Sequence, residues 1–286
     1  MPDDRPEREI PSAILPEVAD LATPLGLFER LGSSLGFWRF TVLVALALAW
    51  EGYGRWIDND LLFPTLGETL SALWDATRSG VLPARILASL RILVAGYAIG
   101  LAAAAVFTTI AMSSLVGRAA LSTLTAMFNP LPAVALLPLA LLWFGLGAPS
   151  LIFVIVHSVL WSVSLNAYAG FGAVNQTLRM VGWNLGIRGW RHVALILVPA
   201  AFPAILSGLK IGWAFAWRTL IAAELVFGVS SRSGGIGWFI YENRNQLETP
   251  SVFAGLFVVI IIGLLVESVI FRFIESRTVR RWGMQR

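Results

Sequence analysis

Six long runs of apolar residues, separated by shorter polar stretches, dominate this chain. A helix needs about 20 predominantly apolar residues to cross the hydrocarbon core of a bilayer, and each run reaches roughly that length. The pattern predicts an all-α integral membrane protein with about six transmembrane helices in one domain, residues 37–286. The predicted spans are Phe37–Trp56, Ser89–Met112, Ala119–Phe144, Pro149–Gly170, Ala201–Gly228 and Val252–Ile274.

The third run is interrupted by Asn129, Pro130, Pro132 and Pro138. A proline inside a helix removes one backbone hydrogen bond and kinks the chain. In a membrane, the freed carbonyls are tolerated only where protein or a water-filled cavity satisfies them. The interruption therefore indicates either the wall of a transport pathway, with Asn129 as a candidate lining residue, or a structural kink.

The fifth run contains three ionisable residues, Lys210, Arg218 and Glu224. Such a group in a span costs about 2.5–3.5 kcal/mol on insertion scales, which makes each a candidate for function. Lys210, Trp217 and Glu224 recur every seven residues and share one helical face, whereas Arg218 lies about 100° from Trp217. Trp217, Arg218 and Glu224 are therefore candidates for the pathway wall, with Arg218 or Lys210 attracting an anion. The alternative is packing, in which Lys210 reaches the cytoplasmic end and Glu224 pairs with a neighbouring span.

A polar segment rich in tryptophan and arginine, Met180–Pro199, separates the fourth and fifth runs. Because a connection can be as short as Gly145–Ala148, this length indicates an ordered helix outside the bilayer that docks onto a cytoplasmic protein. The alternative is an interfacial helix with its Trp and Arg residues at the lipid headgroups. The arginines are concentrated on this side of the spans, which predicts that both termini and residues 171–199 are cytoplasmic.

Two long segments are expected on the outer side. In Asp58–Ala88, apolar residues recur at helical spacing between Leu66 and Thr77, which predicts a short interfacial helix. In Val229–Ser251, the sequence Ser-Gly-Gly-Ile-Gly at 233–237 predicts turns.

Two further patterns predict contacts between helices. His157, Ser158 and Asn166 in the fourth run are expected to hydrogen-bond to neighbouring helices, with a ligand role as the alternative. In the second run, small residues at every fourth position from Gly96 to Ala104 predict close helix packing, within one chain or across a dimer.

The composition agrees with a membrane protein and excludes several classes of enzyme. Hydrophobic residues make up 57% of the chain and charged residues 13%, against about 25% charged in soluble domains. Cysteine is absent, only two histidines occur, and there is no G-x-x-x-x-G-K-[ST] phosphate loop. We therefore expect no catalytic residues, no metal site and no cofactor. The first 36 residues lack an apolar stretch after a basic start, which predicts a cytoplasmic tail and no cleaved signal peptide.

Several motifs resemble the permeases of bacterial ABC importers. In the cytoplasmic loop signature of that family, Glu-Ala-Ala precedes a Gly, and an Ile and Leu-Pro follow. Gly186, Ile196 and Pro199 stand at the matching positions, Val198 replaces the Leu, and residues 180–182 are Met-Val-Gly instead of Glu-Ala-Ala. Further motifs are similar to permeases of the nitrate, sulfonate and taurine group; they lie at 129–132, 139–147, 199–203, 208–210, 216–217, 223–224 and 235–237.

This resemblance implies a type I ABC importer permease of the MetI-like fold in the bacterial inner membrane. It implies a permease pair, expected to be a homodimer, with two cytoplasmic ATPase subunits that bind and hydrolyse ATP and a periplasmic binding protein. The loop at about 175–199 would couple the ATPases to alternating access for a small anion such as taurine, an alkanesulfonate or nitrate. Its expected coupling residues are Trp183, Gly186, Arg188, Trp190 and Arg191. An ATP-independent secondary transporter or channel is the alternative, and a membrane scaffold is a third possibility.

Overall fold

The computed structural model describes residues 34–227 and 234–278, and within these ranges the regular structure is helical without any strand. The chain divides into two compact units, Met1–Gly52 and Tyr53–Arg286, which we describe separately. The cytoplasmic tail predicted for residues 1–36 lies outside the described residues up to position 33. The same holds for the arginines at 279–286 that contribute to the topology prediction.

The described part of the first unit belongs to helix α2, Leu35–Ile57. Large apolar side chains along this helix are exposed, among them Phe40, Leu43 and Leu46. Such a surface suits lipid and not water. The predicted first span, Phe37–Trp56, lies within this helix, which is long and apolar enough to cross a membrane.

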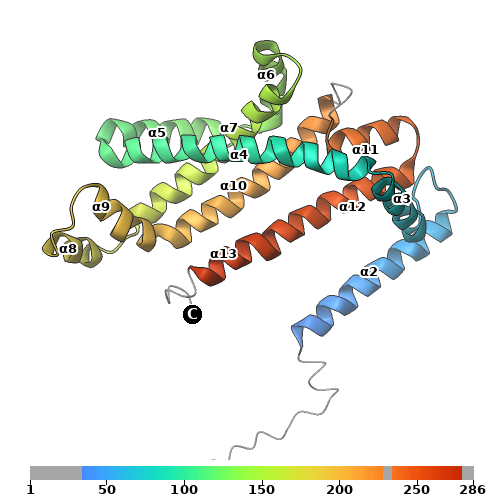
Figure 1. Cartoon of the computed structure of the whole chain (residues 1–286), viewed down its shortest axis with the longest axis horizontal. Coiled ribbons are helices and arrows are strands. Elements are labelled where there is room, and N and C mark those ends of the chain that lie inside the picture. The colour runs from blue at the N-terminus through green and yellow to red at the C-terminus, as the bar shows by residue number, and fades with distance from the viewer. Residues whose placement is uncertain (1–33, 228–233, 279–286) are drawn as a thin grey trace, which may run out of the picture. The chain divides into compact units, whose positions relative to one another are not determined.

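In the second unit, α7 packs against both α4 and α10, and these three helices form the centre (Figure 1). Near one end of the centre α11 contacts α4, α10 and α12, and α12 also contacts α3; the short α8 and α9 lie toward the other end. The elements are α3 (Leu66–Arg78), α4 (Val81–Ser113), α5 (Leu115–Phe128), η1 (Ala133–Leu136), α6 (Leu137–Phe144), α7 (Ala148–Gly172), α8 (Gln176–Asn184), α9 (Trp190–His192), η2 (Val193–Leu197), α10 (Val198–Phe227), α11 (Ile236–Asn245), α12 (Thr249–Leu265), η3 (Val266–Phe271) and α13 (Arg272–Arg277).

The short helix predicted from Leu66 is present as α3. Its start is fixed by a capping box: the Thr65 hydroxyl accepts the Glu68 N–H at 3.2 Å, and the Glu68 carboxylate accepts the Thr65 N–H at 2.8 Å. Two of the backbone donors that a helix start leaves without partners are satisfied in this way.

The small residues of α4 pack against α7 within one chain. A Cβ atom added at Gly96 would lie 2.7 Å from Ile155 Cγ2, and one at Gly100 would lie 2.8 Å from Val159 Cβ. The Ser164 hydroxyl also donates to the Ala104 carbonyl at 3.5 Å. The absence of side chains at the two glycines therefore allows the backbones to approach closely, as small-residue stripes do in membrane helices.

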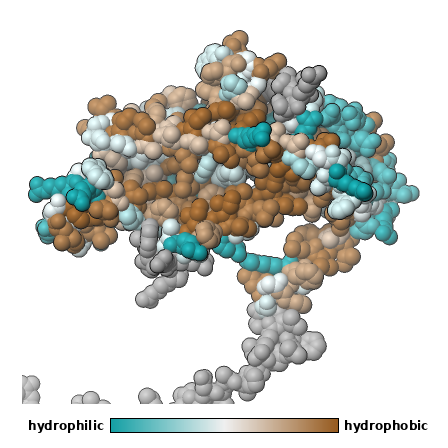
Figure 2. All heavy atoms as spheres, viewed as in Figure 1, coloured by the Kyte–Doolittle hydropathy of each residue, from teal (hydrophilic) through white to brown (hydrophobic). Residues whose placement is uncertain are grey.

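Much of the visible surface over the long helices is apolar, with hydrophilic residues gathered toward their ends (Figure 2). Five described helices are long and apolar enough to cross a membrane, or six if the pair α5 and η1–α6 counts as one span. The prediction of an all-α membrane protein with about six spans is confirmed.

The third apolar run, predicted as Ala119–Phe144, is broken at the predicted interruption. Helices Leu115–Phe128 and Ala133–Phe144 meet at 90°, with residues 129–132 between them. Pro130 and Pro132 explain the break, because each lacks a backbone donor and its ring clashes with the preceding helical turn.

The helix that contains the predicted fifth span begins at Trp190, eleven residues before the predicted start at Ala201. A continuous helical path of 37 residues runs from Trp190 to Val226. Just before Pro199 it contains a π-helical segment, Val193–Leu197. This wider turn lies where the proline removes a donor and crowds the preceding turn.

Two other boundaries also differ from the predictions. Helix α4 begins at Val81, eight residues before the predicted Ser89, because the segment before Ser89 is also apolar on one side, with Leu82 buried. Helix α11 begins at Ile236, within the sequence 233–237 that predicts turns; Gly234 and Gly235 precede the helix, and position 233 lies outside the described residues.

Glu224 and Ser89 cap the start of α11 from two other helices; we call these residues, with Ile236 and Gly237, the Glu224 clamp. The Ser89 hydroxyl donates to the Glu224 carboxyl at 2.9 Å and accepts the Ile236 N–H at 2.8 Å. Glu224 accepts the Gly237 N–H at 2.8 Å. Since the N-cap residue is Gly235, α11 has no capping side chain of its own. Ser89 and Glu224 take the place of a capping side chain by accepting the N–H groups at the start of α11. The helix dipole also favours an acidic group at a helix N-terminus.

Arg85 reinforces the same junction from α4. Its Nη1 donates to the Gly234 carbonyl at 2.9 Å, and its Nη2 lies 3.3 Å from the Glu242 carboxylate. The junction thus joins α4, α10 and α11 through hydrogen bonds at a place where Ser89 and Glu224 are buried.

We expect Gly237→Ala to destabilise the protein. An added Cβ would lie 2.8 Å from the Ile221 carbonyl oxygen and 2.5 Å from Glu224 Cβ. Overpacking of this kind costs about 1–3 kcal/mol. The midpoint of thermal unfolding of the purified protein in detergent should fall. Gly172→Ala is the control, because a Cβ there meets no atom within 4 Å. Equal midpoints for the two variants would contradict the role of the clamp.

Candidate functional site

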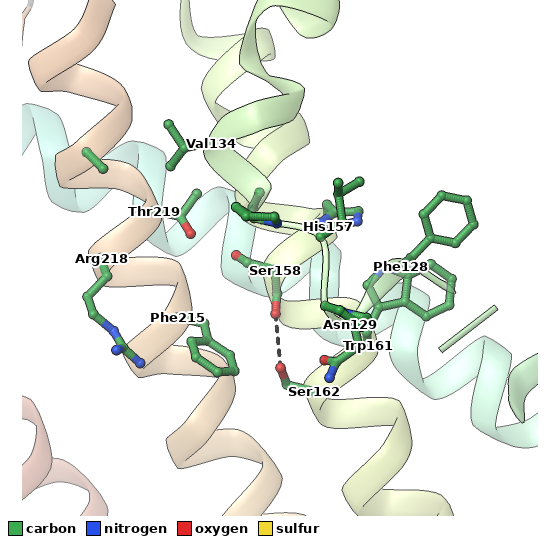
Figure 3. Close-up of a pocket in the computed structure, with 15 residues that line it drawn as sticks. Phe128, Asn129, Val134, His157, Ser158, Trp161, Ser162, Phe215, Arg218 and Thr219 are labelled. Carbon is green, nitrogen blue, oxygen red and sulfur yellow. Dashed lines mark hydrogen bonds between the residues drawn. The ribbon is translucent and has the colours of Figure 1, made fainter. Parts of the chain in front are cut away.

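A cavity of about 350 Å³ lies at the break between α5 and η1 (Figure 3). One side is formed by the end of α5 and the linker 129–132, another by α7, and a third by α10. The 90° turn of the chain carries η1–α6 away from the line of α5, so that the linker and the start of η1 border this space together with α7 and α10.

Aromatic rings form much of the cavity wall. Phe128 stacks on Trp161, with ring centroids 5.5 Å apart and planes 13° apart. His157 meets both rings edge-on at 6.3 Å. Phe215 faces the cavity from α10, opposite the α7 residues (Figure 3). These rings leave a largely apolar space with a few polar atoms at its edge, which is the usual composition of a small-molecule site.

Several polar groups of α7 at the cavity have no partner in another helix. Both imidazole nitrogens of His157 and the indole nitrogen of Trp161 are buried without a hydrogen bond among the described residues. Ser158 donates within α7, to the Ile155 carbonyl at 2.8 Å, and Asn166 donates to the Ser162 carbonyl at 2.8 Å. The hydrogen bonds between helices that were expected from His157, Ser158 and Asn166 are therefore not present in the described part of the chain.

Arg218 supplies the charge of the cavity. Its Nε donates to the Ala214 carbonyl at 3.1 Å, and its guanidinium carbon lies 5.0 Å from the centre of the Phe215 ring. Among the residues that the structure describes it makes no ion pair, and none of the residues lining the cavity is acidic. An arginine is always protonated, so the cavity carries an uncompensated positive charge.

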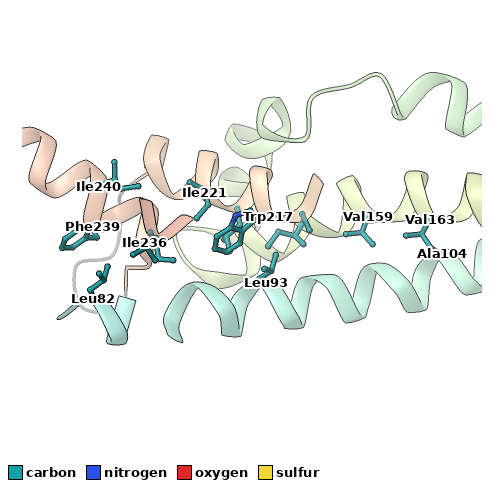
Figure 4. Close-up of a cluster of buried hydrophobic side chains, with 14 residues drawn as sticks. Leu82, Leu93, Ala104, Val159, Val163, Trp217, Ile221, Ile236, Phe239 and Ile240 are labelled. Carbon is teal, nitrogen blue, oxygen red and sulfur yellow. The ribbon is translucent and has the colours of Figure 1, made fainter. Parts of the chain in front are cut away.

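The structure brings two of the four pathway candidates to this cavity and separates the other two from it. Asn129 and Arg218 line the space. Trp217 is 6% exposed and lies in the hydrophobic core with Leu93 and Val159, where its indole donates to the Val259 carbonyl at 3.3 Å (Figure 4). Glu224 belongs to the clamp.

Lys210 forms an ion pair with Glu275 at 2.6 Å, so it packs α10 against the last described helix. The heptad spacing of Lys210, Trp217 and Glu224 thus marks the packed face of α10. Sequence reasoning did not propose Phe128, Trp161 or Thr219 for the cavity; only the interruption at 129–132 could have drawn attention to their surroundings.

The second candidate region is the predicted coupling loop, which consists of α8, a turn and the first residues of the helix that begins at Trp190. Gly186 and Gly189 have φ angles of +72° and +61°. This left-handed conformation suits glycine, so the two glycines allow the chain to reverse between α8 and Trp190.

The loop is held against the membrane helices by a few contacts. Arg179 donates to the Phe171 carbonyl at 2.5 Å and so binds α8 to the end of α7. A Cβ at Gly182 would clash with Ile196 and His192, and Trp183 stacks on His192 with ring centroids 5.9 Å apart. The loop is therefore an ordered part of the fold.

The solvent-exposed surface of the loop is apolar and basic. Trp183, Leu185 and Trp190 are 55%, 70% and 77% exposed, and Arg188 and Arg191 are also exposed. No acidic residue occurs between positions 176 and 192. Tryptophan and arginine are among the residues enriched at protein interfaces, so this surface has the character of a docking site. All five predicted coupling residues lie on the loop or at its end.

Comparison with known proteins gives a consistent result. A family described as "Binding-protein-dependent transport system inner membrane component" matches residues 96–280. A putative ABC transporter permease of Methanocaldococcus jannaschii is 28% identical over 82% of this chain and 88% of its own length. The taurine transport system permease of Escherichia coli is 34% identical over 52% of this chain and 53% of its own length. The nitrate import permease of Synechocystis is 35% identical over 64% of this chain and 66% of its own length.

We expect the cavity to be accessible to water-soluble reagents, because polar groups line its edge. In this cysteine-free chain, Ser158→Cys should react with a small charged methanethiosulfonate in the purified protein. The matched control is Ser164→Cys on the same helix, whose serine is fully buried against α4 and should not react. Equal reactivity of the two cysteines would contradict an open cavity.

Proposed function

The chain belongs to the family of binding-protein-dependent transport system inner membrane components, and we propose that the substrate it conducts is a small anion. As an ABC importer permease of the taurine, nitrate and sulfonate group, it is a multi-pass inner-membrane protein that is not itself catalytic. Its family implies ATPase and substrate-binding partners. This membership supports an ATP-driven importer over an ATP-independent secondary transporter or channel.

The observation that carries the anion proposal is Arg218 at a cavity without acidic residues. A cation would be repelled by this charge, whereas an anion would be attracted and could accept hydrogen bonds from the free guanidinium N–H groups. Asn129 and Thr219 line the same space and add uncharged polar groups. Attraction without many strong bonds suits a transport pathway, because the substrate must also leave.

In the proposed assembly, two copies of this chain form the pathway and two cytoplasmic ATPase subunits bind and hydrolyse ATP. Both termini and the loop at 175–199 face the cytoplasm, and a periplasmic protein delivers the substrate to the outer side. The exposed apolar and basic surface of the loop supports its contact with the ATPase, with Trp183, Gly186, Arg188, Trp190 and Arg191 as the coupling residues. Met180 and Val181, both exposed, stand where the family has Glu and Ala.

Arg218→Gln is expected to lower ATP-driven uptake by about tenfold or more, since a hydrogen bond to a charged group contributes about 1.5–3 kcal/mol. Arg218→Lys should keep part of the activity if charge alone matters. Uptake into proteoliposomes that contain the whole complex is the measurement, with the amount of assembled complex as a second readout.

Arg277→Gln is the matched control, because Arg277 also lies 5.0 Å over a phenylalanine ring but does not line the cavity. Unchanged uptake in Arg218→Gln would refute the anion route. Loss of the assembled complex would refute it equally and indicate that Arg218 acts in packing.

Gly186→Pro is expected to uncouple ATP hydrolysis from uptake. Proline cannot adopt the φ of +72° found here, and it removes the N–H that Gly186 donates to the Trp183 carbonyl at 3.0 Å. Gly186→Asn is the control, because asparagine tolerates the left-handed conformation. The double variant Trp190→Ala/Arg191→Glu should uncouple in the same way without altering the turn. ATPase activity and uptake, measured on one preparation, should separate in the uncoupled variants. Uptake at the level of the unmodified complex would show that the loop does not transmit the movement.

A further inference from the structure

We infer that the cavity at the α5–η1 break accepts an anion with a planar aromatic body, such as an aromatic sulfonate or carboxylate. This inference rests on the proposed function, because it assumes that the cavity belongs to the anion route, and it names the substrate class of that site. Three observations carry it: the size of the cavity, the arrangement of its rings and the kind of polar atoms at its edge.

The cavity is too large and too apolar for a very small anion alone. Its volume is about 350 Å³, whereas an apolar cavity of about 150 Å³ already holds a benzene molecule. Nitrate or a short alkanesulfonate would leave most of the aromatic wall facing water. A ring attached to the anionic group would cover that wall and gain from its burial.

The rings offer contacts from two sides. Phe128, Trp161 and His157 form one connected cluster on the α5–α7 side, and Phe215 lies opposite on α10 (Figure 3). Aromatic rings prefer offset-stacked or edge-to-face contacts, and both kinds already occur within this cluster. A planar aromatic ligand can therefore make stacked or edge-to-face contacts with these rings.

The polar atoms at the edge favour a guest rich in acceptors. Asn129, Arg218 and Thr219 line the cavity without any acidic residue beside them, and a guanidinium can only donate hydrogen bonds. The Arg218 guanidinium therefore offers donors to a sulfonate or carboxylate oxygen, and its charge excludes the quaternary ammonium compounds that aromatic cages otherwise bind.

The test compares two anions with the same head group. Binding of benzenesulfonate and methanesulfonate to the full-length chain in lipid nanodiscs would be measured by titration calorimetry, with empty nanodiscs correcting for partition into lipid. Benzenesulfonate should bind about tenfold more tightly, in line with the contribution of a few aromatic contacts. The binding protein is left out, so that its own selectivity does not enter.

Variants assign the difference to the cavity. Trp161→Leu and, separately, Phe215→Leu should reduce the preference for benzenesulfonate to about twofold or less, as expected from the loss of ring contacts. Phe215 is 38% exposed, so its replacement tests the idea even if Trp161→Leu does not fold. Trp143→Leu is the control: Trp143 is 58% exposed on α6 and does not line the cavity.

Arg218→Gln should weaken both anions by the same factor, because they share the head group. Equal binding of the two sulfonates, no binding of either, or a preference that survives both ring variants would overturn the aromatic class. None of those outcomes would refute the anion route itself, which is tested by the uptake experiment on Arg218→Gln. The two proposals can therefore be refuted independently.

Discussion

A peptide group in the core of a bilayer has no water with which to form hydrogen bonds. Both the regular helices and the irregular segments of this protein are shaped by that constraint. Along α4, α7 and α10 the backbone is satisfied within each helix, so these helices can pack closely through glycines such as Gly96. At residues 129–132 the prolines prevent this, and the exposed backbone borders a cavity with polar groups at its edge. At the start of α11, where the N-cap is a glycine, the missing acceptors come from Ser89 and Glu224 on other helices.

Much of the fold could be predicted from the sequence, because the length of an apolar run and the spacing within it are local properties. They identified the membrane spans and α3, and the small residues of α4 correctly indicated a close helix contact. Which neighbouring helix a helical face contacts is not a local property of the sequence. The spacing of Trp217 and Glu224 shows that they share a face but not that this face is packed. Phe128 and Trp161 read as ordinary apolar residues, and only the 90° break turns them into the wall of a cavity.

One helix connects the two candidate regions. The path from Trp190 to Val226 is continuous, so the exposed Arg191 of the loop and Arg218 at the cavity are about 40 Å apart along one rod, at 1.5 Å per residue. A helix transmits a displacement along its axis better than a flexible connection does. The π-helical turn at Val193–Leu197 lies near the loop end of this helix. The helix from Val198 to the cavity is therefore α-helical without a second such turn.

The Glu224 clamp has a consequence for how this sequence can change over evolutionary time. A side chain at position 235 would collide with Ser89 and Glu224, and one at position 237 would collide with the backbone of α10. The two glycines therefore leave room for Ser89 and Glu224, and these two side chains in turn accept the Ile236 and Gly237 N–H groups, respectively. Substitutions at positions 89, 224, 235 and 237 are acceptable mainly in combination, so related sequences should vary at these four positions together.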